Sequence, residues 1–201
     1  MPAIAKPRNV ITHFTTERNL KNIWKILLVV FIIIIIGFVI VTDIFDRGQY
    51  YSTFAPKEEM IEFYMYKTTE EQEKAFEKNF GNEKYSFPRE EVAEVKLFRN
   101  RFLLSRLTSK TLSKSSKSEV IAFFNNPVNF DWGETTWEVA ESEYILRFYN
   151  KEDKEIGKIW LCLEGCGMTK SIPFSPNMKY GGLSENGKKG IEKIINKILN
   201  E

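Results

Sequence analysis

The sequence predicts an α+β protein, with one N-terminal transmembrane helix followed by a small domain that has an antiparallel β-meander, flanking helices and a C-terminal amphipathic helix. Three observations predict this class. Residues 26–42 contain no charged side chain and include five consecutive isoleucines. Residues 135–163 form apolar segments separated by polar turns, as in successive strands. Residues 184–199 place apolar side chains at helical spacing.

The composition limits the chemistry of the chain. It has 201 residues, which is enough for one globular unit and an appendage. Hydrophobic residues make up 43% and charged residues 28%, values that are normal for a folded protein. His13 is the only histidine. The chain therefore lacks the residues for a Ser-His-Asp or Cys-His mechanism in its C-terminal part, and for a histidine-rich zinc site.

The uncharged run is long enough to cross a bilayer as a helix. At about 1.5 Å per residue its seventeen residues cover roughly 25 Å, and the apolar residues on either side extend this to about 30 Å. Trp24 and Lys25 stand at one edge, as an interfacial aromatic residue and a snorkelling cation do. A buried β-strand is the alternative, but the run lacks alternation. We therefore expect residues 23–45 to contact the lipid bilayer.

The charges around this run predict its orientation. Residues 1–25 carry five cations and one acid, a net charge of +4, which leaves −2 for the remainder of a chain whose formal net charge is +2. The positive-inside rule then places the N-terminus in the cytoplasm. The run exceeds a signal-peptide core, and no small-residue cleavage site follows it. We expect a single-pass protein of the inner (plasma) membrane whose C-terminal domain is periplasmic or extracellular.

The chain thus divides into four parts. Residues 1–22 form a basic cytoplasmic arm, which we expect to be unstructured because Pro2 and Pro7 oppose an early helix. Residues 23–45 form the transmembrane signal anchor, and residues 46–56 a stalk. Residues 57–201 form the extracytoplasmic domain.

The first part of this domain contains one clear helix. Residues 60–66 fit a strand or a helical stripe equally well. Thr69 and Gln72 have the spacing of a capping box, and Phe76 and Phe80 then share one face before Gly81. The pattern predicts a short helix from residue 69 to residue 80.

Residues 89–107 leave two possibilities open. Pro88 and the acids after it suit the first turn of a helix. Residues 92–98 and 102–107 also fit the two strands of a hairpin, which we slightly favour. Residues 108–118 are rich in Ser, Thr and Lys and are expected to form a loop. Ser118 would then cap a short helix over residues 119–124.

The strongest strand signals come next. Residues 135–139, 143–149 and 156–163 are expected to form the antiparallel meander, with residues 150–154 as a tight turn. Tyr144, Leu146 and Phe148 would share one face of the sheet. Residues 165–182 are expected to be a loop, and Ser184 the cap of the final helix. That helix places its apolar residues on one side, namely Ile191, Ile194, Ile195, Ile198 and Leu199. Helices should therefore cover one face of the sheet.

The only two cysteines, Cys162 and Cys166, form the first candidate site. In an oxidising compartment they are expected to form a structural disulfide. Their C-x3-C spacing differs from the C-x-x-C of thiol redox enzymes. Together with Met168 they also have the donor set of a soft-metal site, because thiolate and thioether ligands suit Cu(I).

A second candidate site lies in the loop of residues 125–137. Trp132 and Trp137 stand beside Asp131 and Glu134, and aromatic rings next to carboxylates suit a glycan- or peptide-binding surface. The tryptophans could equally belong to the core. The two acids could form the acid pair of a glycosidase only if their separation and pKa values suit that chemistry.

These observations favour a non-enzymatic, membrane-anchored protein whose extracytoplasmic domain binds a protein partner, such as an envelope assembly factor or a toxin inhibitor. The alternatives are a cell-wall glycan or soft-metal binding module, and a hydrolase that uses carboxylates alone. No cofactor motif is present in the sequence. Nucleic acid is not expected to bind, because the part beyond the uncharged run is slightly acidic.

Overall fold

The computed structural model describes residues 11–41, 68–100, 109–132, 142–164 and 166–201, and all structural statements below concern these residues. The chain forms two compact units, Met1–Val41 and Thr42–Glu201. Each unit is described separately.

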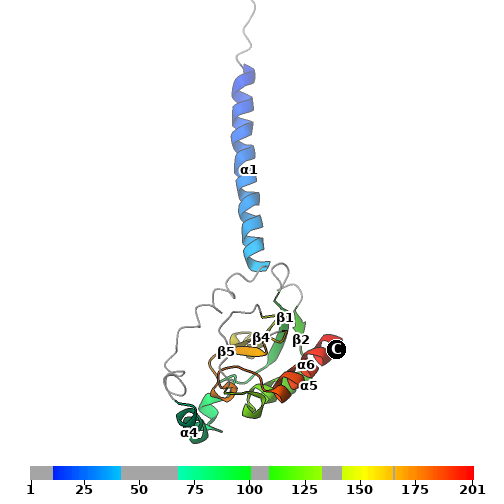
Figure 1. Cartoon of the computed structure of the whole chain (residues 1–201). Coiled ribbons are helices and arrows are strands. Elements are labelled where there is room, and N and C mark those ends of the chain that lie inside the picture. Colours follow the sequence, from blue (N-terminus) through cyan, green and yellow to red (C-terminus); the bar gives the residue numbers. More distant parts are fainter. Residues whose placement is uncertain (1–10, 42–67, 101–108, 133–141, 165) are drawn as a thin grey trace, which may run out of the picture. The chain divides into compact units, whose positions relative to one another are not determined.

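The first unit contains helix α1, Ile11–Val41 (Figure 1). The helix begins at Ile11, so the prediction of an unstructured arm over residues 1–22 is wrong for its second half. The reason is that Pro2 and Pro7 both precede Ile11 and therefore do not interrupt the helix. The side chains of α1 are described for residues 22–38, and its large apolar side chains from Ile23 to Phe38 are 43–68% exposed.

Among the residues that the structure describes, no helix has both the length and the apolar character that a membrane span needs.

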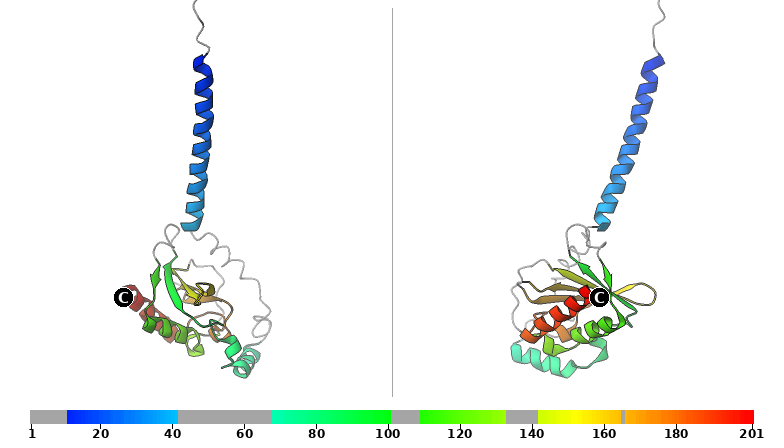
Figure 2. Two further views of the ribbon diagram at one scale, coloured as in Figure 1. Left: turned by 180° about the vertical axis from the view of Figure 1, so that it is seen from behind. Right: turned by 90° about the vertical axis from the view of Figure 1, so that its right-hand side faces the viewer.

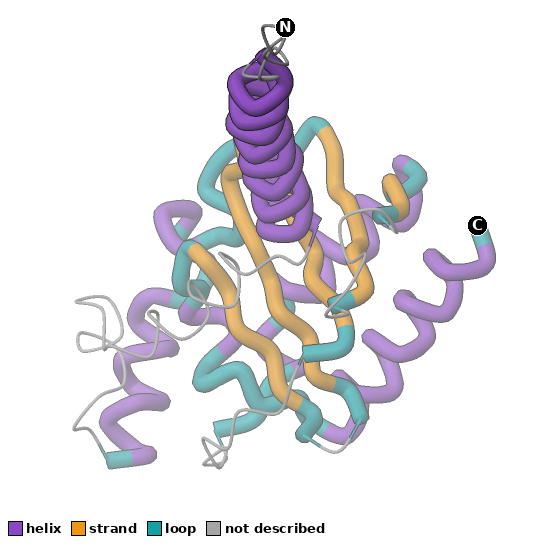
Figure 3. The backbone as a smooth tube through the Cα atoms, turned by 90° about the horizontal axis from the view of Figure 1, so that it is seen from above, coloured by secondary structure: helices purple, strands orange, loops and turns teal. Residues whose placement is uncertain are grey.

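The second unit is an α+β domain, as the sequence predicts. Five strands among its described residues form one antiparallel sheet in the order β2-β1-β3-β4-β5. Figure 3 shows the strands of this sheet in orange. The strands are β1 (Glu94–Arg99), β2 (Lys110–Thr111), β3 (Tyr144–Tyr149), β4 (Glu155–Cys162) and β5 (Met168–Ile172). The helices are α4 (Thr69–Asn79), α5 (Lys114–Phe124) and α6 (Glu185–Asn200), with short 3-10 turns η1 (Glu83–Tyr85), η3 (Pro127–Asn129) and η4 (Pro176–Met178).

Helices α5 and α6 lie side by side on one face of the sheet (Figure 2). Leu146 and Phe148 of β3 are fully buried against them, and Tyr144 packs against the same core, so the predicted face of this strand is confirmed. The other strands and the two helices contribute the remaining core residues, among them Val95, Leu97, Ile159, Leu161, Val120, Phe124, Ile191 and Ile195. The core therefore forms between the sheet and two helices, as amphipathic elements require.

The final helix and its cap are confirmed. The hydroxyl of Ser184 accepts a hydrogen bond from the amide of Gly187, and α6 buries the predicted stripe on its sheet side. The capping box of α4 is also present, but one residue earlier than predicted. Thr68 and Glu71 form it, because Gln72 turns inward and is buried.

Helix α5 corrects the prediction for residues 108–118. It begins at Lys114 and is capped by Ser113, so Ser118 lies inside the helix rather than at its cap. Tertiary contacts explain the earlier start. Ser116 is fully buried, and the Glu201 carboxylate accepts hydrogen bonds from the hydroxyls of Ser113 at 3.0 Å and Ser116 at 2.6 Å. A carboxylate at this helix end also interacts favourably with the helix dipole.

The sheet settles part of the open question over residues 89–107. Residues 94–99 form β1, which pairs with β2 and β3, so this part of the predicted hairpin is a strand. Its predicted partner, residues 102–107, lies outside the described residues, as do residues 60–66, residues 135–139 and the stalk. The predicted turn over residues 150–154 joins β3 to β4 and is confirmed.

Strand β5 lies within residues 165–182, where the sequence predicted a loop. It forms because its backbone pairs with β4 on one side and meets Gly181 on the other, where the amide of Thr169 donates to the Gly181 carbonyl at 2.7 Å. Gly181 has a φ of +91°, and a Cβ there would lie 3.2 Å from the carbonyl carbon of Thr169 and closer still to its oxygen. The pairing with β4 and the close approach of Gly181 to Thr169 do not require any periodic pattern of residues, so the sequence does not reveal this strand.

The contact between Glu201 and α5 gives a pH-dependent prediction. The hydrogen bond from Ser116 is the main reason that the pKa of Glu201 is lowered, so the folded state binds the proton less readily than the unfolded state. The stabilisation is then complete above the ordinary glutamate pKa of about 4.3 and is lost as the pH falls through the lowered value. We expect Glu201→Gln to lower the thermal midpoint at pH 7, and this difference from wild type to shrink towards pH 3.

Thermal melts of both proteins between pH 3 and pH 8 test this. Glu152→Gln, at an exposed position in the turn after β3, is the control and should differ little from wild type throughout. A difference between Glu201→Gln and wild type that stays constant over the whole range would contradict the assignment.

Candidate functional site

A cluster of aromatic side chains joins helix α4 to two segments that follow much later in the chain. We call Phe76, Phe80, Tyr85, Trp132, Phe174 and Tyr180 the aromatic cluster. Tyr85 is its most buried member, and Trp132, Phe174 and Tyr180 pack against it while remaining partly exposed. The sequence placed only Trp132 of these residues in a candidate site.

Four rings of the cluster form a continuous chain. Their centroids are 5.3 Å apart between Phe80 and Phe76, 5.9 Å between Phe76 and Trp132, and 5.9 Å between Trp132 and Tyr180. The last two contacts are edge-to-face, the arrangement that ring quadrupoles favour. Helix α4 is therefore held to the domain through Phe76, and Phe80 packs on the outer side of that ring.

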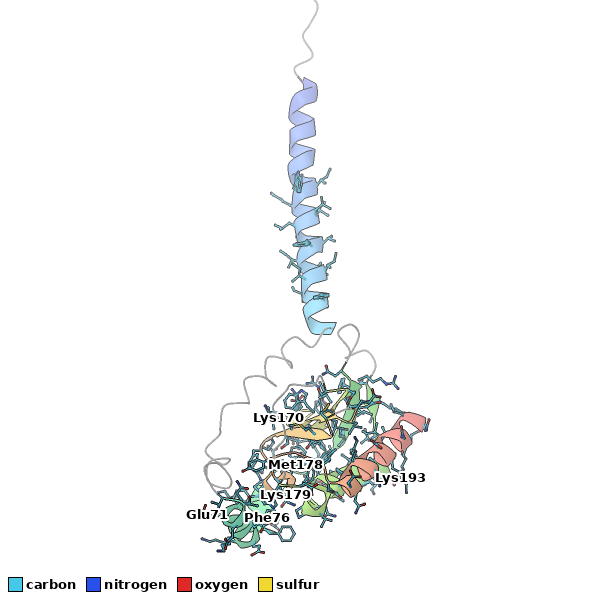
Figure 4. The ribbon with its side chains drawn as sticks, in the orientation of Figure 1. Glu71, Phe76, Lys170, Met178, Lys179 and Lys193 are labelled. Atoms are coloured by element: carbon cyan, nitrogen blue, oxygen red, sulfur yellow. A yellow bond between two sulfur atoms is a disulfide. The ribbon has the colours of Figure 1, made fainter. Side chains whose placement is uncertain are left out.

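Lys179 lies against the face of Trp132, with its amine 5.4 Å from the ring centroid. The amine donates a hydrogen bond to the backbone carbonyl of Phe130. Figure 4 shows Phe76, on α4, and Lys179 in the same part of the domain. Partial burial lowers the pKa of the Lys179 amine, whereas the carboxylates of Asp131 and Glu73 act in the opposite direction.

Polar contacts fix the cluster from two further sides. The Gln72 side-chain amide, on the buried side of α4, donates to the hydroxyl of Tyr180. The Arg89 guanidinium donates to the Ser86 carbonyl at 3.2 Å and to the Phe174 carbonyl at 2.8 Å. It also lies 5.6 Å from the ring centroid of Tyr85. These contacts make the cluster a preorganised surface rather than a set of loosely placed rings.

The predicted residues of the tryptophan loop divide between described and undescribed parts. Trp132 lies in the aromatic cluster, and Asp131 is exposed beside it, with its amide donating to the Gly182 carbonyl at 3.0 Å. Trp137 and Glu134 lie outside the described residues. The pairing of Asp131 with Glu134 as hydrolytic acids therefore stays a prediction, as does a role of Trp137 in binding.

Cys162 and Cys166 are joined as a disulfide, with their Cα atoms 5.8 Å apart. Met168 stands opposite Cys162 in the register of β4 and β5. Disulfide sulfurs are not thiolates, so in this form the two cysteines do not supply the ligands of a soft-metal site. Among the described residues, no group of three or more His, Cys, Asp or Glu side chains is arranged to hold a metal ion.

Trp24 and Lys25, the predicted membrane-interface residues, lie on α1 with exposed side chains.

The sheet face turned away from α5 and α6 carries a second polar arrangement. Lys96, Arg147 and Lys158 stand directly opposite one another on β1, β3 and β4. Arg147 and Lys158 are only 7% and 4% exposed in their side chains, and both contact the carboxylate of Glu155, at 2.7 Å and 3.1 Å. The buried Phe98 and Trp160 lie beside them, as cation–π partners of Arg147 and Lys158. Because both cations are buried, we interpret this arrangement as structural.

Sequence reasoning missed Lys179, Arg89 and Tyr180. Lys179 has a φ of +50°, a backbone conformation that is uncommon for lysine and that the sequence does not reveal. Arg89 lies within residues 89–107, for which the sequence leaves helix and hairpin open, and no local pattern there points to Tyr85 or Phe174. The aromatic Tyr180 between Lys179 and the Gly181-Gly182 pair was the one available signal, because a large ring in a Pro/Gly-rich loop needs a surface to pack against.

The chain matches no protein-family model, no curated protein and no solved structure.

Proposed function

We propose that this chain is a single-pass, membrane-anchored, non-enzymatic protein whose extracytoplasmic domain binds a protein partner, in the manner of an envelope assembly factor or a toxin inhibitor. The observation that carries the anchoring is the exposure of the large apolar side chains from Ile23 to Phe38. A helix that is apolar on all sides needs an apolar surrounding, which a bilayer supplies. The uncharged run of the sequence continues beyond these side chains to Thr42.

Charge and redox chemistry support the proposed orientation. The cations of the first 25 residues favour a cytoplasmic N-terminus by the positive-inside rule. The disulfide between Cys162 and Cys166 suits an oxidising compartment and would be reduced in most cytoplasms. Both arguments favour the same orientation in the proposed inner (plasma) membrane, with the N-terminus in the cytoplasm and the domain on the outer side.

The aromatic cluster supports binding of a protein rather than of glycan. Interfaces between proteins are rich in aromatic residues that are held rigidly and flanked by polar groups. Glycan platforms instead offer an open ring face to the sugar, and Lys179 lies over a face of Trp132. Protein binding therefore agrees better with the geometry of the cluster.

Cysteine labelling tests the topology. We would add one cysteine at Asn9 or at the exposed turn residue Glu152, and treat intact protoplasts with a membrane-impermeant maleimide. We expect Glu152→Cys to react in intact protoplasts and Asn9→Cys only after lysis. The unaltered chain is the control, because its two cysteines form the disulfide. Recovery of the full chain in the soluble fraction, or the opposite labelling pattern, would refute the proposal.

A further inference from the structure

Helix α4 presents a stripe that alternates carboxylates and aromatic rings. Glu73, Phe76, Glu77 and Phe80 follow the spacing i, i+3, i+4 and i+7, so they share one face. Glu73 and Glu77 are exposed, Phe76 is half-buried, and Phe80 is 56% exposed. Among the large apolar side chains described in the second unit, only Phe80 and Val128 are exposed to this degree. We call these four residues the α4 stripe.

The stripe is held in place before any partner arrives. The Thr68–Glu71 capping box fixes the start of the helix, and Gln72 and Phe76 attach it to Tyr180 and Trp132. A preorganised surface loses less conformational entropy on binding than a mobile one. The exposed Phe80 ring continues the chain of rings that begins at Tyr180, so it is the outer end of a packed cluster rather than an isolated apolar residue.

The charges of α4 favour one kind of partner. Glu70 is paired with Lys74 at 2.7 Å, and Glu71 belongs to the capping box. In the part of the chain that the structure describes, neither Glu73 nor Glu77 belongs to an ion pair like that of Glu70 with Lys74, although the Glu73 carboxylate acts electrostatically on the Lys179 amine. A partner that placed cations there would gain charge-assisted contacts. An anionic bilayer would be repelled by the same two carboxylates.

Resting on the proposed binding function, we infer that the α4 stripe docks a basic and apolar segment of a partner protein. The segment places an aromatic or aliphatic side chain against Phe80 and Phe76, and Lys or Arg side chains against Glu73 and Glu77. The rings supply the desolvated centre of the contact, and the carboxylates select the charge of the partner.

The test uses the full chain in nanodiscs of zwitterionic lipid, so that basic peptides do not bind to the lipid. A displayed library of random twelve-residue peptides is selected against wild type, and the dissociation constants of the selected peptides are then measured. We expect peptides with an apolar anchor flanked by Lys or Arg. Phe80→Ser should weaken their binding at least tenfold. The double variant Glu73→Lys/Glu77→Lys should lose these peptides and bind counterparts in which Glu replaces Lys and Arg.

The matched control is Glu152→Lys/Glu192→Lys, which makes the same change in net charge away from α4 and should alter binding less than twofold. Near-UV circular dichroism checks that each variant keeps its aromatic packing. Selection of no peptides or of acidic peptides would overturn the inference, as would binding that survives both α4 variants. Retention on insoluble peptidoglycan that is lost only in Phe80→Ser would also overturn it, in favour of a glycan surface. None of these results depends on the topology measured by maleimide labelling.

Discussion

Gly187→Ala is expected to destabilise the second unit by about 3 kcal/mol, the upper end of what overpacking usually costs. Gly187 lies in the first turn of α6, where that helix meets η3. A Cβ at this position would lie 2.8 Å from the carbonyl carbon of Asn129, 3.1 Å from its Cα and closer still to its oxygen. That carbonyl also accepts the amide hydrogen of Ser184 at 3.0 Å, so it cannot move away without loss.

The thermal midpoint reports this effect. For a domain of this size a loss of about 3 kcal/mol corresponds to a decrease of roughly 6–12 °C. Gly190→Ala is the matched control, because Gly190 lies one turn further along the same helix and its added Cβ would meet only the ring edge of Phe123, at 3.3 Å. Alanine is also favoured over glycine in a helix by about 1 kcal/mol. Gly190→Ala should therefore stay within about 1 kcal/mol of wild type, and equal midpoints for the two variants would contradict the close approach at Asn129.

Glu155→Gln is expected to cost about 3 kcal/mol, because it removes a carboxylate shared by two buried cations. Arg147 and Lys158 face each other on neighbouring strands, and like charges in that arrangement repel. Glu155 contacts both cations, whereas a neutral amide would still accept a hydrogen bond but would not offset either charge. Chemical denaturation of the two proteins measures the difference.

Two further variants test whether the loss of stability in Glu155→Gln comes from the buried cations or from the loss of any ion pair. Glu91→Gln removes an ion pair of similar length, 2.8 Å to Lys151, but both side chains are largely exposed, so the loss of stability should be much smaller than that of Glu155→Gln. Adding Lys158→Met to Glu155→Gln removes one of the two cations and should recover part of the stability. If both variants lowered the free energy of unfolding by the same amount, the burial of the two cations beside Glu155 would not increase the contribution of that ion pair to stability.

The parts of the fold that could be predicted are those with a local periodic signal. Residues 143–149 alternate as a strand, and α6 carries its apolar stripe at helical spacing, so both revealed their type and their buried side. Residues 156–163 revealed only that they form a strand. Helix α5 had no such signal before residue 119. Its start at Lys114 depends on Glu201, which lies far away in the sequence.

The candidate site was predictable only in part, for the same reason. Trp132 and Asp131 stood out as an aromatic residue beside an acid, and Phe76 and Phe80 as one face of a helix. The two segments come together through the ring contact between Phe76 and Trp132, which are more than fifty positions apart in the chain. Spacing along the chain carries no information about such a contact.

The sequence by itself determined the α+β class, the apolar segment, the cysteine pair and the amphipathic final helix, because each follows from residues that are close together in the chain. Only the tertiary structure decided the order of the strands, the existence of β5, the early start of α5 and the joining of α4 to Trp132 and Tyr180. Those features depend on close approaches between distant segments, such as Gly181 at Thr169 and Gly187 at Asn129. Such a contact requires a residue without a side chain where two backbones approach closely, and it does not require any periodic pattern. Where the backbones approach is known only after the segments have packed together.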